Sequence, residues 1–151
     1  MKKNKIKDTG LEVTELSFGT SSLGSMPDTY GYEVSEDRAQ KTLNRFFQGP
    51  VNMLDTSRNY AMGESEKRIG KAIKENGGWP NGFLLSTKLD RNMDTLVLDK
   101  NRVRESLEES LKTLNVDSVD ILFLHDPEYA KDITDITKKD GAMDELFKIK
   151  N

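Results

Sequence analysis

Four side chains that can transfer protons lie at the ends of apolar stretches or shortly after one. Asp55, Lys88 and His125 each end an apolar stretch, and Tyr60 follows Asp55 by five residues. A carboxylate, an ammonium, an imidazole and a phenol are groups that general acid–base catalysis uses. The ammonium in particular needs a partner, because an unpaired buried charge is costly. We therefore expect these four residues to form the chemical centre of the protein.

The apolar stretches before three of these residues are predicted β-strands. Alternate residues of a strand point to the same face. The residues that share a face with each polar end are Val51 and Met53 before Asp55, Leu84 and Ser86 before Lys88, and Val119, Ile121 and Phe123 before His125. The carboxyl ends of parallel strands meet at one edge, where α/β proteins bind ligands. The pattern predicts that the three polar ends converge there, with Tyr60 bending over them.

Strands and helices are predicted to alternate along the whole chain. A hairpin is expected at residues 5–14, strands at 16–20, 51–55, 83–89 and 119–125, and helical stripes at 39–47, 64–75, 103–114 and 142–147. Ser35 and Asp99 are expected helix N-caps, and Gly49 with Pro50 ends the first helix. This order indicates βαβ units, a parallel sheet and an α/β fold. We expect residues 1–151 to form a single domain.

The strand predicted at residues 119–125 is almost wholly apolar until it reaches His125. Such a composition is typical of a parallel strand that is covered on both faces. We therefore expect its side chains to be buried on both sides of the sheet.

Composition argues against several classes of function. With 23 Lys and Arg against 26 Asp and Glu, the net charge of −3 provides no basic footprint for nucleic acid. The chain has no cysteine, and its one histidine with scattered carboxylates gives no metal-ligand spacing. No apolar run reaches the roughly 18 residues of a membrane span, and the basic amino terminus lacks the apolar part of a signal peptide. We expect a cytoplasmic protein without nucleic-acid, membrane or metal partners.

Each of the four residues also has a purely structural interpretation. Asp55 can cap the next helix or pair with Lys88 for stability alone, Tyr60 can be an ordinary loop residue, and a lone histidine after a strand is commonly structural. The combination favours function, because three polar ends on adjacent parallel strands are hard to explain by stability.

The segment LDTSRNYAMGESEKRIG, from Leu54 to Gly70, resembles the signature of the aldo-keto reductase family. Supporting motifs lie in the family's order at residues 10–13, 18–20, 86–88 and 119–125. The resemblance covers nearly the whole chain and is strongest to bacterial members that act on sugars and small aldehydes. One departure is Ala61, where many relatives have glycine; because a small residue is kept, we expect little consequence.

The resemblance implies a TIM barrel that transfers hydride between a nicotinamide cofactor, usually NADPH and otherwise NAD, and a small carbonyl or sugar substrate. Tyr60 would be the general acid that protonates the carbonyl oxygen. A free phenol is a poor proton donor near neutrality, and the Lys88 cation would stabilise its phenolate. Asp55 would keep Lys88 charged and oriented, and His125 would hydrogen-bond the substrate carbonyl.

The same resemblance assigns residues to the cofactor and the substrate. Gly19, Thr20 and Asp55 would lie near the nicotinamide end of the cofactor. The loop that contains Met26 and Tyr30 would shape the substrate pocket.

A complete barrel of this type has eight βα units in about 250 residues, whereas this sequence predicts about four, after a hairpin. In the family, most cofactor contacts come from the other half. We therefore expect a half-barrel that is a fragment of a longer enzyme, or one that forms a homo-oligomer through its open sheet edges. The isolated chain should be nearly inactive and not a simple stable monomer, because correct positioning supplies roughly 7–11 kcal/mol of barrier lowering.

Two other functions stay open. Some relatives are regulatory subunits of channels, so a half-barrel could be a non-catalytic interaction or regulatory module, although all four tetrad residues are retained. Lys88 could instead form a Schiff base in an aldolase-like barrel. Borohydride trapping of a carbonyl compound on Lys88 would detect that chemistry, and the tyrosine signature argues against it.

Overall fold

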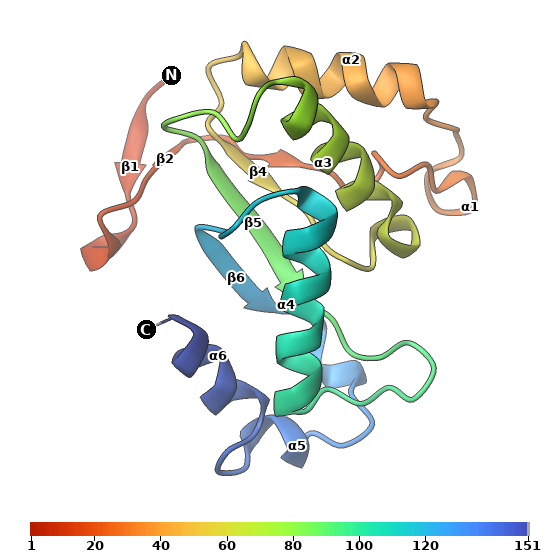
Figure 1. The fold of residues 1–151 in the computed structure, drawn as a ribbon, viewed down its shortest axis with the longest axis vertical. Coiled ribbons are helices and arrows are strands. Elements are labelled where there is room, and N and C mark those ends of the chain that lie inside the picture. The colour runs from red at the N-terminus through yellow and green to blue at the C-terminus, as the bar shows by residue number, and fades with distance from the viewer. Residues whose placement is uncertain (151) are drawn as a thin grey trace.

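Strands and helices alternate through residues 1–150, which are the residues described by the computed structural model (Figure 1). The strands are β1 (Lys3–Lys5), β2 (Glu12–Thr14), β3 (Phe18–Gly19), β4 (Met53–Asp55), β5 (Leu84–Leu89) and β6 (Ile121–Leu124). The longer helices are α2 (Glu36–Phe47), α3 (Glu64–Glu75), α4 (Lys100–Leu114) and α6 (Ala142–Lys150). Short helical segments are α1 (Pro27–Tyr30), α5 (Thr134–Thr137), η1 (Lys7–Thr9), η2 (Tyr60–Gly63) and η3 (Pro127–Tyr129). The predicted α/β class is confirmed.

The strands β3, β4, β5 and β6 form one parallel sheet in that order. One row of paired residues across the sheet consists of Gly19, Asp55, Ser86 and Ile121. Paired residues of neighbouring strands project to the same face, so Asp55 and Lys88 share a face, as the alternation predicted. The helices α2, α3 and α4 pack over the opposite face (Figure 1), which carries the buried side chains of Leu54 and Leu85.

Helix α2 begins where the sequence predicted, because Ser35 caps it. The Ser35 Oγ accepts a hydrogen bond from the backbone N–H of Arg38 at 3.2 Å, which satisfies one of the free donors of the first turn. The buried face of the helix consists of residues at helical spacing, Ala39, Leu43 and Phe46. This stripe fixes which side of α2 lies against the sheet.

Helices α3 and α4 approach each other closely at Gly70. A Cβ at this position would overlap the backbone of Thr113 on α4, so only glycine permits the contact without a shift. Helix α4 begins after Asp99, whose Oδ1 accepts hydrogen bonds from the backbone N–H groups of Asn101 (3.0 Å) and Arg102 (2.9 Å). The predicted N-cap is confirmed.

Two clusters of apolar side chains fill the space between the helices and the sheet. The first joins α2, α3, β4 and β5, and its fully buried members include Leu43, Leu54, Ile69 and Ile73. The second lies between β5, α4, α5 and α6, and contains Leu89, Leu98, Val103 and Ile136. Burial of apolar surface is the dominant favourable term in folding, so these clusters hold the strand ends in place.

Asn52 joins the hairpin β1–β2 to the sheet. The Asn52 Oδ1 accepts a hydrogen bond from the backbone N–H of Thr14 at 2.9 Å, and its Nδ2 donates to the carbonyls of Glu12 (2.9 Å) and Gly82 (3.1 Å). Because Asn52 is buried, these bonds satisfy an amide that would otherwise be costly to bury. The hairpin predicted from the sequence is confirmed.

Strand β6 is less covered than its composition indicated. The expectation that it is buried on both faces is wrong, since Phe123 is 50% exposed and the other three residues of the strand are half-buried. Within residues 1–150, β6 pairs with β5 alone. Its other edge and one of its faces therefore have few neighbours in the described chain.

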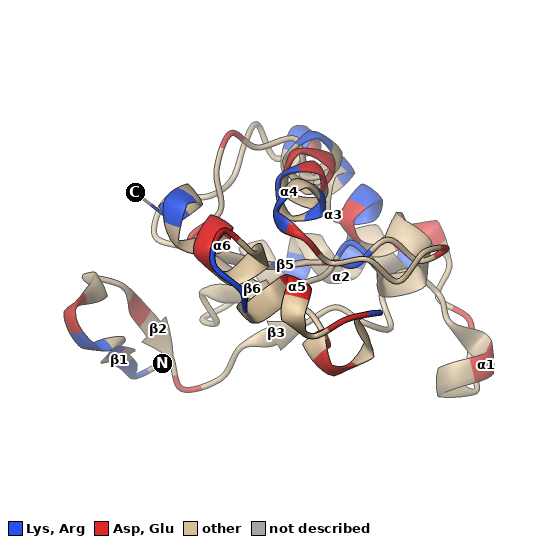
Figure 2. Cartoon of the chain, turned by 90° about the horizontal axis from the view of Figure 1, so that it is seen from below, with Lys and Arg blue, Asp and Glu red and all other residues tan. Residues whose placement is uncertain are grey.

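Acidic and basic residues are mixed along the helices, with blue and red segments adjacent on α3 and α4 (Figure 2). Several form ion pairs, such as Lys71 with Glu36 at 2.9 Å and Arg102 with Glu109 at 2.9 Å. This mixing agrees with the small net charge of the sequence. Across residues 1–150 we find no helix whose length and apolarity would suit a membrane span.

Candidate active site

A lysine–aspartate pair lies at the carboxyl ends of the two central strands. The Lys88 Nζ donates to the Asp55 Oδ2 and to the backbone carbonyl of Thr56, each at 2.7 Å. The Ser86 hydroxyl donates to the Asp55 Oδ1 at 2.9 Å, because the strand register places these residues side by side. The side chain of Lys88 is only 14% exposed, and Asp55 is the charge partner that such a position requires.

Tyr60 lies beside this pair, in the loop after β4. The Lys88 Nζ is 4.8 Å from the centroid of the Tyr60 ring, which places a cation next to a phenol. Tyr60 also meets the His125 ring edge to face, with the centroids 5.7 Å apart and the planes at 83°. The structure thus brings together Asp55, Tyr60, Lys88 and His125.

The turn that carries Tyr60 has a strained backbone. Ala61 (φ 52°, ψ 44°) and Met62 (φ 54°, ψ 37°) both adopt the left-handed conformation, which costs a residue with a Cβ about 1–2 kcal/mol. Glycine would avoid this cost at position 61, and the expectation that alanine there has little consequence stays a prediction. The close neighbour Gly24 allows for the extra methyl group, because a Cβ at Gly24 would overlap that of Ala61.

Two polar residues that contact the His125 imidazole, Asp90 and Ser57, were not identified from the sequence. Asp90 is fully buried, and its Oδ1 lies 2.5 Å from the His125 Nδ1. The Ser57 hydroxyl donates to the Asp90 Oδ2 at 2.8 Å and lies 3.0 Å from the same ring nitrogen. A signal for Asp90 was present, because it follows Lys88 by two residues and so shares its parity at the end of the same strand.

The residues expected near the cofactor lie at the end of β3. Gly19 is exposed and pairs with Asp55, and a Cβ at Gly19 would meet no atom within 4 Å. Thr20 is buried, and its hydroxyl donates to the backbone carbonyl of Asp55 at 2.9 Å. Open space therefore adjoins Asp55 at Gly19, whereas Thr20 supports the end of β4.

The residues expected at the substrate pocket belong to the loop after β3. Met26 precedes α1, and Tyr30 ends it. The Tyr30 hydroxyl donates to the Ser21 Oγ at 2.6 Å, and its ring lies 6.3 Å from that of Tyr32. These contacts attach α1 to the end of β3, and the substrate role of Met26 and Tyr30 stays a prediction.

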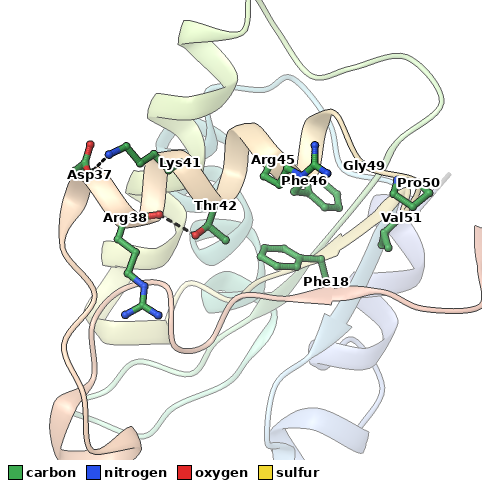
Figure 3. A pocket seen from close by; sticks show the side chains of 10 residues that line it. All are labelled: Phe18, Asp37, Arg38, Lys41, Thr42, Arg45, Phe46, Gly49, Pro50 and Val51. Atoms are coloured by element: carbon green, nitrogen blue, oxygen red, sulfur yellow. Dashed lines mark hydrogen bonds and ion pairs between the residues drawn. The ribbon is translucent and has the colours of Figure 1, made fainter.

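Two hollows lie along the edges of the sheet, away from the four-residue cluster. One of about 590 Å³ lies between β3 and α2 (Figure 3), and its lining combines the apolar Phe18, Phe46 and Val51 with the basic Arg38, Lys41 and Arg45. The other, of about 770 Å³, lies along β6, and its lining includes Ile121, Phe123 and Leu146. Both hollows border an edge strand of the sheet rather than its carboxyl end.

Glu66 on α3 is a further carboxylate close to these strands, and it is fully buried. The Thr87 hydroxyl donates to its Oε1 at 2.7 Å. Burial raises the pKa of the Glu66 carboxyl, and the hydrogen bond from Thr87 offsets only part of this effect. Glu66 therefore lies in a part of the molecule where a negative charge is disfavoured.

Comparison with known families gives the same assignment as the motifs. Residues 15–149 match the family described as the aldo/keto reductase family. The chain belongs to this family. The matched range includes the whole cluster of Asp55, Tyr60, Lys88 and His125, and the resemblance inferred from the sequence is confirmed.

Three aldo/keto reductase relatives show how much of the family's length this chain spans. It is 38% identical to the L-galactose dehydrogenase of Arabidopsis thaliana over 122 residues, which cover 81% of this chain and 37% of that protein. It is 33% identical to the aldo-keto reductase YhdN of Bacillus subtilis, covering 85% of this chain and 39% of that protein. The holo form of the aldo-keto reductase AKR11C1 from Bacillus halodurans superposes with a TM-score of 0.69 at 27% identity, over 99% of this chain and 47% of that one. The chain thus spans less than half the length of each of these relatives.

Proposed function

We propose that this chain acts in a nicotinamide-dependent oxidoreductase that reduces a small aldehyde, ketone or sugar, or oxidises the corresponding alcohol. The observation that carries the proposal is the Lys88–Asp55 pair, with the Lys88 Nζ 4.8 Å from the Tyr60 ring, at the carboxyl ends of parallel strands. A cation held beside a phenol is the arrangement that makes tyrosine a useful proton donor.

The residues of this chain take distinct roles in the proposed reaction. Tyr60 gives its hydroxyl proton to the carbonyl oxygen during reduction, and the Lys88 ammonium stabilises the phenolate that forms. Asp55 keeps Lys88 in place, and Ser86 in turn holds Asp55 through the 2.9 Å hydrogen bond. His125, whose ring packs edge to face on that of Tyr60, hydrogen-bonds the substrate oxygen. Positioned proton transfer of this kind contributes roughly 100- to 10,000-fold in rate.

The end of β3 fits the nicotinamide part of a cofactor. Bound NADPH, or otherwise NAD, would supply the hydride. Gly19 leaves open space beside Asp55, where a flat ring can approach the cluster without meeting a side chain. Met26 and Tyr30, in the loop that follows, would border the substrate.

A hydroxyl-rich substrate is the specific class we favour. The support comes from the relatives, one of which is an L-galactose dehydrogenase at 38% identity. The cluster itself recognises only the carbonyl or alcohol group that reacts, so the remaining contacts to a sugar would come from loops such as that of Met26 and Tyr30.

A chimaera tests the proposal, because the chain spans 39% of YhdN. Residues 1–150 would replace the matching part of YhdN, and oxidation of NADPH by a panel of aldehydes would be followed by absorbance. We expect turnover in the chimaera and a loss of at least about 100-fold in its Tyr60→Phe variant, with NADPH affinity nearly unchanged. The unfused 151-residue chain should show little or no turnover.

The matched control is Tyr129→Phe, which removes a hydroxyl from a tyrosine that is 61% exposed. This variant should turn over like the parent chimaera. Equal turnover of the Tyr60→Phe variant and the parent would show that another group donates the proton, and the proposed function of this cluster would be wrong.

A further inference from the structure

We propose that Asp90 is the positioning residue of His125: it keeps a proton on the Nδ1 of the imidazole and leaves Nε2 as the nitrogen available to a substrate oxygen. The placement of the proton concerns this chain alone, whereas the use of Nε2 rests on the function proposed above. The orientation of an active-site histidine is commonly set by the bond that its other nitrogen makes.

The distance between Asp90 and His125 decides where the proton lies. Asp90 Oδ1 and His125 Nδ1 are 2.5 Å apart, and Asp90 is fully buried. Without a proton between them, two lone pairs would face each other at this distance in a site that water does not reach. The other Asp90 oxygen accepts two hydrogen bonds, so the side chain acts as an acceptor and the imidazole supplies the shared proton from Nδ1.

The neighbours of Asp90 lead to the same result. The Asp90 Oδ2 accepts hydrogen bonds from the Ser57 hydroxyl at 2.8 Å and from the backbone N–H of Asn59 at 3.1 Å. Since the Ser57 proton is committed to Asp90, the Ser57 oxygen can only accept from His125 Nδ1, which lies 3.0 Å away. All of these contacts are satisfied together only when Nδ1 carries a proton.

The rest of the imidazole meets groups that do not compete for Nδ1. The Asp126 Oδ1 lies 3.7 Å from Nε2, beyond hydrogen-bond distance, and the Tyr60 ring packs edge to face against the imidazole. The Lys88 Nζ lies near the Tyr60 ring, which is the other ring of that contact. Nε2 is therefore the ring nitrogen that Asp90 and Ser57 leave unengaged, and it can donate to a carbonyl oxygen when the ring is doubly protonated.

Nuclear magnetic resonance can test this directly, because His125 is the only histidine in the sequence. Protonated and unprotonated ring nitrogens differ strongly in ¹⁵N frequency, so a long-range ¹H–¹⁵N correlation spectrum of the ¹⁵N-labelled 151-residue chain gives the proton's place without further assignment. We expect the Nδ1 signal of the folded chain to be that of a protonated nitrogen. A neutral ring with its proton on Nε2 would overturn the proposal.

Asp90→Asn should move the proton. Asn59 and Ser57 both donate to the Oδ2 position, so the amide oxygen would take that place and the NH₂ group would face Nδ1 as a donor. Nδ1 must then accept, and we expect the neutral ring to carry its proton on Nε2; an analogous substitution disrupts the tautomer in serine proteases. Retention of the Nδ1 proton in the folded variant would show that Asp90 does not control it.

Ser57→Ala is the matched variant, since it removes a neighbour of Nδ1 but keeps the Asp90 carboxylate. We expect the Nδ1 proton to be retained there, and its loss would assign the positioning to Ser57 and overturn the proposal. If Asp90→Asn does not fold by circular dichroism, the wild-type and Ser57→Ala spectra still decide. None of these spectra needs cofactor or turnover, so a failure of the proposed function and a failure of this inference can be told apart.

Discussion

Two carboxylates on either side of strand β5, those of Asp55 and Glu66, have very different surroundings. Asp55 lies at the sheet edge, where the ammonium of Lys88 approaches to 2.7 Å. Glu66 is fully buried between the sheet and the helices. Its Oε1 accepts a hydrogen bond from the neutral Thr87 hydroxyl at 2.7 Å. Lys88 and Thr87 are consecutive residues of β5 and so project to opposite faces. One strand thus provides a cation to one carboxylate and only a hydroxyl to the other.

The difference shows what each region can do. At the edge, Asp55 is paired with Lys88 and partly open to solvent, so a charge can persist there, as the proposed proton transfer requires. In the interior, burial raises the pKa of the Glu66 carboxyl, so its neutral, protonated form is favoured over the charged form. Asp55 is thus suited to chemistry, whereas the Glu66 carboxyl is a cost that the surrounding packing must offset.

The largest expected effect comes from Lys88→Met, which would leave Asp55 without a cation. We expect turnover of the chimaera to fall by at least about 100-fold, because the phenolate of Tyr60 loses its stabilising charge. We also expect a loss of about 1–3 kcal/mol in the free energy of unfolding, because a half-buried charge is left unpaired. Urea unfolding followed by circular dichroism measures the second quantity.

The control for Lys88→Met is Lys41→Met, which breaks the 2.7 Å pair with Asp37 on the surface of α2. Exposed pairs of this kind contribute about 0–1 kcal/mol, so little change is expected. If both substitutions lower the free energy of unfolding by the same amount, the Asp55–Lys88 pair contributes no more than a surface ion pair. Asp55 and Glu66 would then not differ in this respect.

A smaller effect of opposite sign is expected from Glu66→Gln. The amide keeps an acceptor for Thr87 and cannot ionise, so the variant should be more stable than the parent by about 1–3 kcal/mol at neutral pH. Because burial raises the pKa of the Glu66 carboxyl above its usual value of about 4.3, the folded state binds more protons than the unfolded one above that pH. The stability of the parent therefore falls as pH rises. Below about pH 4.5 the free energies of unfolding of the two proteins should converge, because Glu66 of the parent is then protonated in both the folded and the unfolded state.

Thermal unfolding of both proteins across pH 3–8 measures this divergence, with Glu108→Gln on the exposed side of α4 as the control. A Glu66→Gln variant that is less stable than the parent at neutral pH would mean that the carboxylate is ionised and favourable in the folded state. Glu66 would then resemble Asp55 rather than contrast with it.

The smallest effect is expected from Ala61→Gly, in the turn between Tyr60 of the edge and Glu66 of the interior. Glycine relieves the left-handed strain at φ 52° but adds freedom to the unfolded chain, so the net gain should be about 0.5–1 kcal/mol. Ala39→Gly in the middle of α2 should lose about 1 kcal/mol or more instead. Equal losses at both positions would show that the turn relaxes around Ala61 without strain.

The architecture was largely predictable because it depends on local patterns. Ser35 and Asp99 cap their helices as predicted, and the alternation that placed Asp55 and Lys88 on one face depends only on strand geometry. The short segments α1 and α5 were missed, since four residues carry no readable apolar period. The exposure of Phe123 was also missed, because apolar composition does not say whether a covering neighbour is present.

The sequence by itself determined which residues form the candidate site: the positions of Asp55, Tyr60, Lys88 and His125 follow from strand ends and motif spacing. Only the tertiary structure decided how they are supported. Asp90 contacts His125 across 35 positions of sequence, and Ser57 contacts it across 68. A local sequence pattern cannot indicate contacts between residues so far apart in the chain. The burial of Glu66 is likewise decided by the packing of α3 and α4 on the sheet, because the energy of a carboxylate depends on what surrounds it in space.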